Sequence, residues 1–191
     1  MKIFLLLVIL LAGFQGIAQK YTNTNQPVVE KKWNQNNFTS EQSFYKNIEM
    51  VSEMSYLSDL LDDEDFRTIL ESNEMITIFA PLDSSLLNFP ENKRDSILNY
   101  NNGSVLRKML KYHIVPGRID SHSITKALEV NDGVVYYATL AGEKLGIKSL
   151  NGNLVLFDTL NNTAILRETD FYHSNGLFHL VEGMVFPIND Q

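Results

Sequence analysis

The chain has 191 residues, a formal net charge of −7 at pH 7 and no cysteine. The acidic balance argues against non-specific nucleic-acid binding, which needs Lys and Arg to neutralise phosphates. The absence of cysteine excludes disulfides, thiol nucleophiles and cysteine-based zinc sites, so an apolar core alone must stabilise the fold, and about 150 residues can supply one.

The first residues have the pattern of a secretory signal. Lys2 precedes an apolar run from Ile3 to Ala12, and small residues follow up to Ala18. Such a run is too short to span a membrane comfortably, so we predict a signal peptide over residues 1–18, with an uncleaved N-terminal anchor as the alternative. Residues 19–42 are rich in Asn and Gln and predict a polar linker, in which Trp33 either docks on the domain or stays exposed.

The predicted domain covers residues 43–189 and opens with helices. Apolar residues at helical spacing predict a helix from Phe44 to Leu61, and the acidic run Asp62 to Asp65 then begins a second, short helix as a solvated start. An apolar strand from Met75 to Ala80 ends at Pro81, and Asp83 is placed to cap the helical turn that follows. Two further helices are predicted over residues 92–100 and 104–113.

After Pro116-Gly117 the pattern changes to strands and turns. We predict strands over residues 134–139, 144–150, 154–158, 163–168 and 177–182, and Asn151-Gly152 is a strong two-residue hairpin signal. Helices in the first half and strands in the second indicate an α+β fold, because a parallel α/β fold would alternate the two.

Three sequence blocks, in this order, resemble the fasciclin (FAS1) family. They are Thr77-Ile78-Phe79-Ala80-Pro81-Leu82-Asp83, Tyr112-His113-Ile114-Val115-Pro116-Gly117 and Asn175-Gly176-Leu177-Phe178-His179-Leu180-Val181. The resemblance covers Phe44 to Ile188 and implies a β-wedge of two sheets, flanked by helices packed from the N-terminal half. We interpret the conspicuous residues of the first and third blocks as structural: Thr77, Phe79, Ala80, Pro81, Asp83, Asn175, Gly176 and His179.

The resemblance also suggests binding residues. In some animal members, the Tyr-His segment and an Asp-Ile pair before the last strand are implicated in integrin recognition. Tyr112 and His113 match the segment, and Asp170 matches the Asp of the pair, whereas Phe171 replaces its Ile. We therefore predict a binding patch formed by Tyr112, His113, Asp170 and Phe171.

No catalytic or metal-binding constellation stands out in the sequence. The four histidines, at positions 113, 122, 173 and 179, lack metal-ligand spacing. Ser121-His122-Ser123 lacks the Gly-x-Ser-x-Gly elbow of a hydrolase. Asp120 and Glu129 are interpreted as ordinary surface carboxylates. We expect no catalytic residues, no metal and no cofactor.

These observations predict a non-catalytic extracellular adhesion or binding module at the cell surface or matrix. Its partner would be a cell-surface or matrix protein or a polysaccharide, with no nucleic acid and no membrane insertion after signal cleavage. The expected location is secreted or extracytoplasmic, which means the periplasm or cell surface in a bacterium. The alternative is an envelope sensor that binds a small hydrophobic molecule or polysaccharide in the wedge between the sheets. A secreted esterase that uses Ser121 is the third hypothesis.

Overall fold

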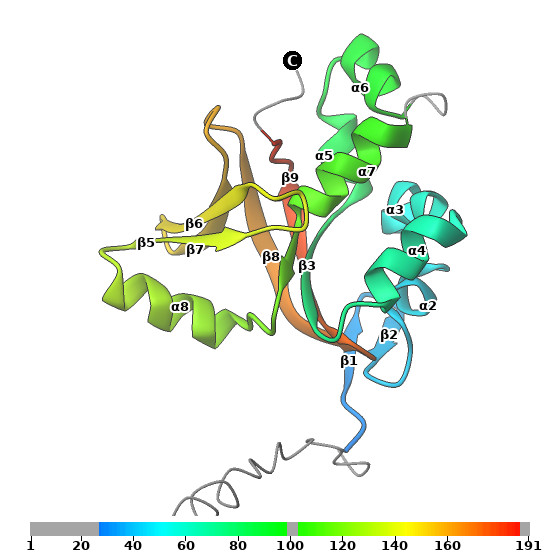
Figure 1. The fold of residues 1–191 in the computed structure, drawn as a ribbon, viewed down its shortest axis with the longest axis horizontal. Coiled ribbons are helices and arrows are strands. Elements are labelled where there is room, and N and C mark those ends of the chain that lie inside the picture. Colours follow the sequence, from blue (N-terminus) through cyan, green and yellow to red (C-terminus); the bar gives the residue numbers. More distant parts are fainter. Residues whose placement is uncertain (1–26, 99–102, 188–191) are drawn as a thin grey trace, which may run out of the picture.

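A seven-stranded sheet forms the centre of the computed structural model, which describes residues 27–98 and 103–187 (Figure 1). The strand order is β4-β3-β9-β8-β7-β6-β5, and every neighbouring pair is antiparallel except β3 and β9, which are parallel. The strands are β3 (Ile76–Pro81), β4 (Ile114–Pro116), β5 (Val134–Ala138), β6 (Lys144–Leu150), β7 (Asn153–Phe157), β8 (Thr163–His173) and β9 (Gly176–Gly183).

The α+β class is confirmed, and the structure refines how the wedge is built. The seven strands are hydrogen-bonded into one continuous sheet, so the wedge does not consist of two separate sheets. The register of β8 against β9 shifts twice, between Leu166 and Glu168 and between Glu168 and Phe171. Such bulges bend a strand and raise its twist. Strand β8 runs on past these bulges to His173, five residues beyond the predicted strand over residues 163–168.

Residues 30–39 form a hairpin, which corrects the prediction of a polar linker over this stretch. Strands β1 (Glu30–Trp33) and β2 (Asn36–Thr39) pair across a turn in which Asn34 has a φ of 52°. Phe38 is 1% exposed and lies in the main core. Trp33 packs against the same core. The hairpin is therefore part of the folded domain. The predicted signal peptide lies outside the described residues.

The helices surround this sheet. They are α2 (Phe44–Ile48), the 3₁₀ turn η1 (Ser52–Met54), α3 (Ser55–Leu61), α4 (Glu64–Glu71), α5 (Asp83–Leu87), α6 (Glu91–Leu98), α7 (Gly103–Tyr112) and α8 (Ser121–Val130). The single helix predicted from Phe44 to Leu61 is thus three short ones, because Val51 takes an extended conformation and α3 begins anew at Ser55. The predicted apolar stripe is nevertheless buried throughout. No helix in the described ranges is long and apolar enough to cross a membrane.

Helix α8 was not predicted, since the sequence after Pro116-Gly117 was read as strands and turns. Asp120 caps it by accepting a hydrogen bond from the Ser123 amide at 2.8 Å. Ile124 and Leu128 are buried, and they join the core cluster that contains the inner residues of β6 and β7. Figure 1 shows α8 lying beside β5–β7, away from the other helices.

Strand β3 is buried on both faces, which explains why its sequence is apolar except for Thr77. Ile76, Ile78 and Ala80 belong to the core beneath the N-terminal helices, whereas Phe79 belongs to the core beneath α8. Successive side chains of a strand point to opposite faces, as this division requires. The sheet therefore separates two cores.

Candidate functional site

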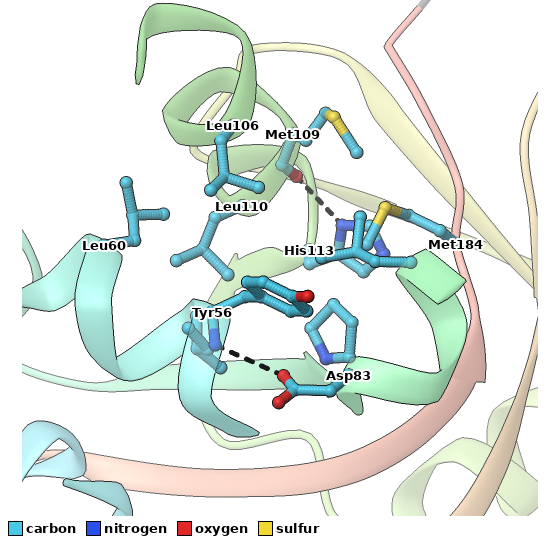
Figure 2. Close-up of a pocket in the computed structure, with 11 residues that line it drawn as sticks. Tyr56, Leu60, Asp83, Leu106, Met109, Leu110, His113 and Met184 are labelled. Atoms are coloured by element: carbon cyan, nitrogen blue, oxygen red, sulfur yellow. Dashed lines mark hydrogen bonds between the residues drawn. The ribbon is translucent and has the colours of Figure 1, made fainter. Parts of the chain in front are cut away.

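An apolar pocket lies between helices α3, α5 and α7 (Figure 2). Its walls include Leu57 and Leu60 of α3 and Leu110 of α7, which are all buried, while Tyr56 and Leu106 are half-buried at its rim. The cavity itself measures about 20 Å³, which is roughly the room that one water molecule needs. The pocket is thus small and apolar, and half-buried side chains border it.

Asp83 positions the helix that forms one wall of this pocket. Its Oδ2 accepts hydrogen bonds from the backbone amide (2.9 Å) and the hydroxyl (2.7 Å) of Ser55, and its Oδ1 accepts from the Tyr56 amide at 3.3 Å. The carboxylate therefore caps the N-terminus of α3, where amides are free and negative charge is favoured. This corrects the expectation that Asp83 caps the helical turn after it, because Leu82 is the N-cap of α5 and makes no side-chain cap bond.

His113 is fully buried and borders the same pocket. Its Nδ1 lies 2.9 Å from the Met109 carbonyl oxygen, which can only accept, so Nδ1 carries the proton. Its Nε2 is then an acceptor, and it has no hydrogen-bond partner among the described residues. Burial lowers the pKa of His113 to about 4, so the imidazole is neutral at pH 7. The site combines apolar walls with one unpaired acceptor.

The predicted binding patch is wrong as a surface, because three of its four residues are interior. Tyr112 is 2% exposed and donates from its hydroxyl to the Lys144 carbonyl oxygen at 2.9 Å. Phe171 is fully buried and belongs to a different core cluster from Tyr112. Asp170 is only partly exposed. These residues therefore share no face that a large partner could reach.

Asp170 joins strand β8 to helix α8. Its carboxylate accepts hydrogen bonds from the Ser121 amide at 2.8 Å, from the Ser121 hydroxyl and from the Thr169 hydroxyl. Burial alone would raise the pKa of Asp170, but the hydrogen bonds from Ser121, together with the nearby His179 and the bond from Thr169, hold that pKa below its usual value. Asp170 takes a positive φ of 60°, a conformation that Asp tolerates better than most residues.

Ser121, Asp170 and His179 gather at this junction without forming a catalytic triad. His179 lies 2.8 Å from the Ile119 carbonyl through Nε2, which must therefore carry the proton, and its Nδ1 accepts from the Asp170 amide at 3.2 Å. Both ring nitrogens are thus occupied by backbone groups, and the Ser121 hydroxyl bonds to the carboxylate. Burial lowers the pKa of His179. A triad would instead need the imidazole to accept the serine proton.

The structural motif residues of the first block hold the interior together. Thr77 donates to the Gly117 carbonyl and accepts from the Ile119 amide, both at 2.8 Å. Phe79 stacks on the His179 ring at a centroid distance of 5.3 Å. Ala80 is buried, and Pro81 lies at the end of β3 beside the pocket.

The turn of the third block ties β9 to helix α4. Asn175 donates from its side-chain amide to the carbonyls of Leu70 (2.9 Å) and Asn73 (3.0 Å). A Cβ on Gly176 would lie 1.8 Å from the Ile76 carbonyl oxygen, so only glycine allows β9 to approach β3 this closely. These residues position the strands.

The acidic run is a helix start, as predicted. Asp63 caps α4 by accepting from the Phe66 amide at 3.0 Å, and it also pairs with Arg107 of α7. Across residues 27–98 and 103–187, no three His, Cys, Asp or Glu side chains gather where they could hold a metal ion. His173 bonds through Nδ1 to the Asn175 side-chain oxygen at 2.9 Å, and burial lowers its pKa to about 4.

Two relatives cover parts of this chain. Protein sll1483 from Synechocystis sp. is 32% identical over 118 residues, which are 62% of this chain and 58% of that protein. Periostin from Homo sapiens is 24% identical over 149 residues, which are 78% of this chain and 16% of periostin. The chain therefore spans less than two thirds of the length of either relative.

A solved structure has the same fold. The FAS1 domain pair from the insect cell adhesion molecule fasciclin I matches with a TM-score of 0.62 at 13% identity, over 85% of this chain and 67% of that one. The family model of the Fasciclin domain matches residues 52–187, which are most of the chain. The chain belongs to the fasciclin domain family.

Proposed function

We propose that this chain is a non-catalytic adhesion or binding module that acts outside the cytoplasm, with a cell-surface or matrix protein or a polysaccharide as its partner. One observation carries the proposal: the groups that the sequence offers for chemistry are already used to build the fold. Ser121 and Asp170 bond to each other, and both nitrogens of His179 bond to the backbone. The fold shared with an insect cell adhesion molecule also supports an adhesive function.

The test is an attachment assay with the whole chain. Cells of the source organism, or their envelope or matrix fractions, should retain more beads that carry the purified chain than beads that carry an unrelated protein of equal net charge. Equal retention of the two kinds of beads would refute the proposal. In parallel, hydrolysis of ester substrates that disappears in Ser121→Ala would establish an enzyme instead.

A second candidate function is the binding of a small hydrophobic molecule, and the pocket of Figure 2 favours it. The candidate site lies among the helices, whereas the sequence-based alternative placed it between the sheets. Leu60, Leu106 and Leu110 offer apolar contact, and Nε2 of His113 lacks a donor. The ligand that fits is neutral, with an apolar part and one hydroxyl or amide N–H. Because the cavity is small, Met109 and Met184 must move to admit it, which flexible methionines do readily.

Native mass spectrometry of the chain purified from its source tests this second function. A retained small molecule is expected, and Leu106→Trp, which fills the pocket, should abolish its retention. Leu87→Trp is the matched control, because Leu87 is an exposed leucine on neighbouring α5. An empty native chain, or equal loss in both variants, would exclude the pocket as the binding site.

A further inference from the structure

One face of strands β5, β6 and β7 points away from the core that α8 covers. Leu145 and Ile147 of β6 are buried in the same cluster as Ile124 and Leu128 of α8. Because side chains alternate along a strand, the residues between and beside these two, which are Lys144, Gly146 and Lys148, lie on the opposite face. The paired positions on β5 and β7 follow from the register: Tyr136 lies beside Gly146, and Phe157 lies on its other side.

This face carries an aromatic pair, in which Tyr136 is exposed and Phe157 is half-buried. The Tyr136 and Phe157 rings meet edge to face, with their centroids 5.7 Å apart. Gly146 between them has no side chain, and a Cβ there would lie 2.4 Å from Cζ of Phe157, so the Phe157 ring lies directly over the β6 backbone. Tyr136 remains 57% exposed. An exposed aromatic side chain of this size, set beside a second ring, offers a flat apolar surface to a ligand.

Two lysines flank the aromatic pair along β6. Lys148 Nζ lies 4.9 Å from the Phe157 ring centroid, and Lys144 is exposed two residues to the other side of Gly146. No ion pair joins Lys144 or Lys148 to a carboxylate in the described part of the chain, whereas Arg167 on β8, two strands away from β6, is paired with Glu182. In an acidic chain, two unpaired cations beside an exposed ring form a local site for an anion.

We propose that this face, formed by Tyr136, Lys144, Lys148 and Phe157 and called here the β6 platform, binds an anionic polysaccharide. The apolar C–H face of a sugar ring stacks on an aromatic ring, and its carboxylates or sulfates pair with lysine. The two lysines lie four residues apart on one strand, about 13 Å at a rise of about 3.3 Å per residue, so one sugar chain that runs along β6 reaches both. An open sheet face suits such a chain, whereas small ligands favour enclosed pockets.

The inference rests on the proposed function and names the chemical class of its partner. Affinity electrophoresis of the whole chain tests it, in gels that contain polygalacturonate, neutral dextran or polyglutamate. Retardation is expected in the polygalacturonate gel alone, and it should weaken as salt is added, because ion pairs contribute. Equal retardation by dextran would refute the role of charge, and equal retardation by polyglutamate would refute recognition of a sugar.

Variants on the platform identify the surface. Lys144→Gln with Lys148→Gln should weaken binding about tenfold, since each exposed ion pair contributes up to about 1 kcal/mol. Tyr136→Ser should weaken binding severalfold with the lysines intact. Lys126→Gln is the matched control, because Lys126 is exposed on α8, on the other side of this sheet region. Each variant is first compared with the parent chain by thermal unfolding. Equal binding by parent and platform variants would overturn the assignment.

The electrophoresis and the attachment assay separate the two proposals. A chain that attaches to cells but passes the polygalacturonate gel freely refutes the β6 platform and leaves the adhesive function standing. A chain that is retarded by the gel but attaches to nothing refutes the adhesive function, and polysaccharide binding then stands alone.

Discussion

Replacing Phe38 with alanine tests whether the hairpin of β1 and β2 belongs to the folded domain. Phe38 is 1% exposed, and its ring meets those of Phe171 and Phe178 edge to face at 5.0 and 5.2 Å. Loss of a buried Phe side chain costs about 3–5 kcal/mol, which includes the cavity that remains. For a domain of this size, each kcal/mol lowers Tm by about 2–4 °C, so a fall of about 6–20 °C is expected.

Urea unfolding followed by circular dichroism measures this change directly. Lys32→Ala is the matched control, because Lys32 is exposed on the paired strand, and it should change the free energy of unfolding by no more than about 0.5 kcal/mol. If Phe38→Ala also costs less than about 0.5 kcal/mol, the hairpin is not docked in solution and residues 30–39 are a linker after all.

Three further changes test other contacts. Asp83→Ala removes the cap of α3 and should lower the free energy of unfolding by about 0.5–2 kcal/mol in urea; an unchanged midpoint would contradict the capping role. Gly176→Ala places a methyl group against the backbone of β3 and should lower the free energy of unfolding by more than about 3 kcal/mol. Gly152→Ala, at a turn with open space, is the control and should lower it by about 1 kcal/mol. Similar Tm values for the two variants would refute the close approach of β9 to β3. Burial lowers the pKa values of His113 and His173 to about 4, below the usual 6.5, so between these pH values the unfolded chain binds more protons than the folded chain. The free energy of unfolding should therefore be highest above pH 6.5 and fall as the pH drops toward 4. A urea midpoint that does not change across that window would show that neither histidine is buried as described.

The strands were largely predictable because their signals are local. The run from Ile76 to Ala80 has apolar residues on both faces, with Thr77 as its one polar residue, and a strand between two cores requires such a pattern. Asn151 and Gly152 have φ angles of 51° and 78°, so the turn that they predicted is the one they form. The α+β class followed from the order of such segments along the chain.

The hairpin and α8 escaped prediction for different reasons. Phe38 is the one fully buried residue among the polar side chains of β1 and β2, so no apolar alternation marks these strands. Helix α8 did carry signals: Asp120 is a good N-cap, and Ile124 and Leu128 are spaced for one helical face. Its position after Pro116-Gly117, at the start of the part of the sequence dominated by strand and turn signals, made a run of turns the simpler interpretation.

The predicted binding patch failed because the resemblance carried no information on exposure. Met109 and Leu110 are buried on α7, and Tyr112 and His113 follow Met109 by three and four residues. Residues at this spacing share a helix face, so the sequence already favoured an interior position for both. By contrast, nothing local distinguishes the pairing that places Tyr136 beside Phe157, because it depends on the register of three strands.

The parallel pairing of β3 and β9 has a consequence for how the chain is made. Strand β9, at residues 176–183, sits in the middle of the sheet between β3 and β8, although it is the last strand along the chain. Until it has been synthesised, β3 has only the three-residue β4 as a neighbour. Pairing β3 with β9 closes a loop of about a hundred residues, and the entropy cost of this closure comes before the contacts can stabilise the sheet. Such long-range pairing slows folding. A nascent chain therefore cannot complete the centre of this sheet before residues 176–183 have been synthesised.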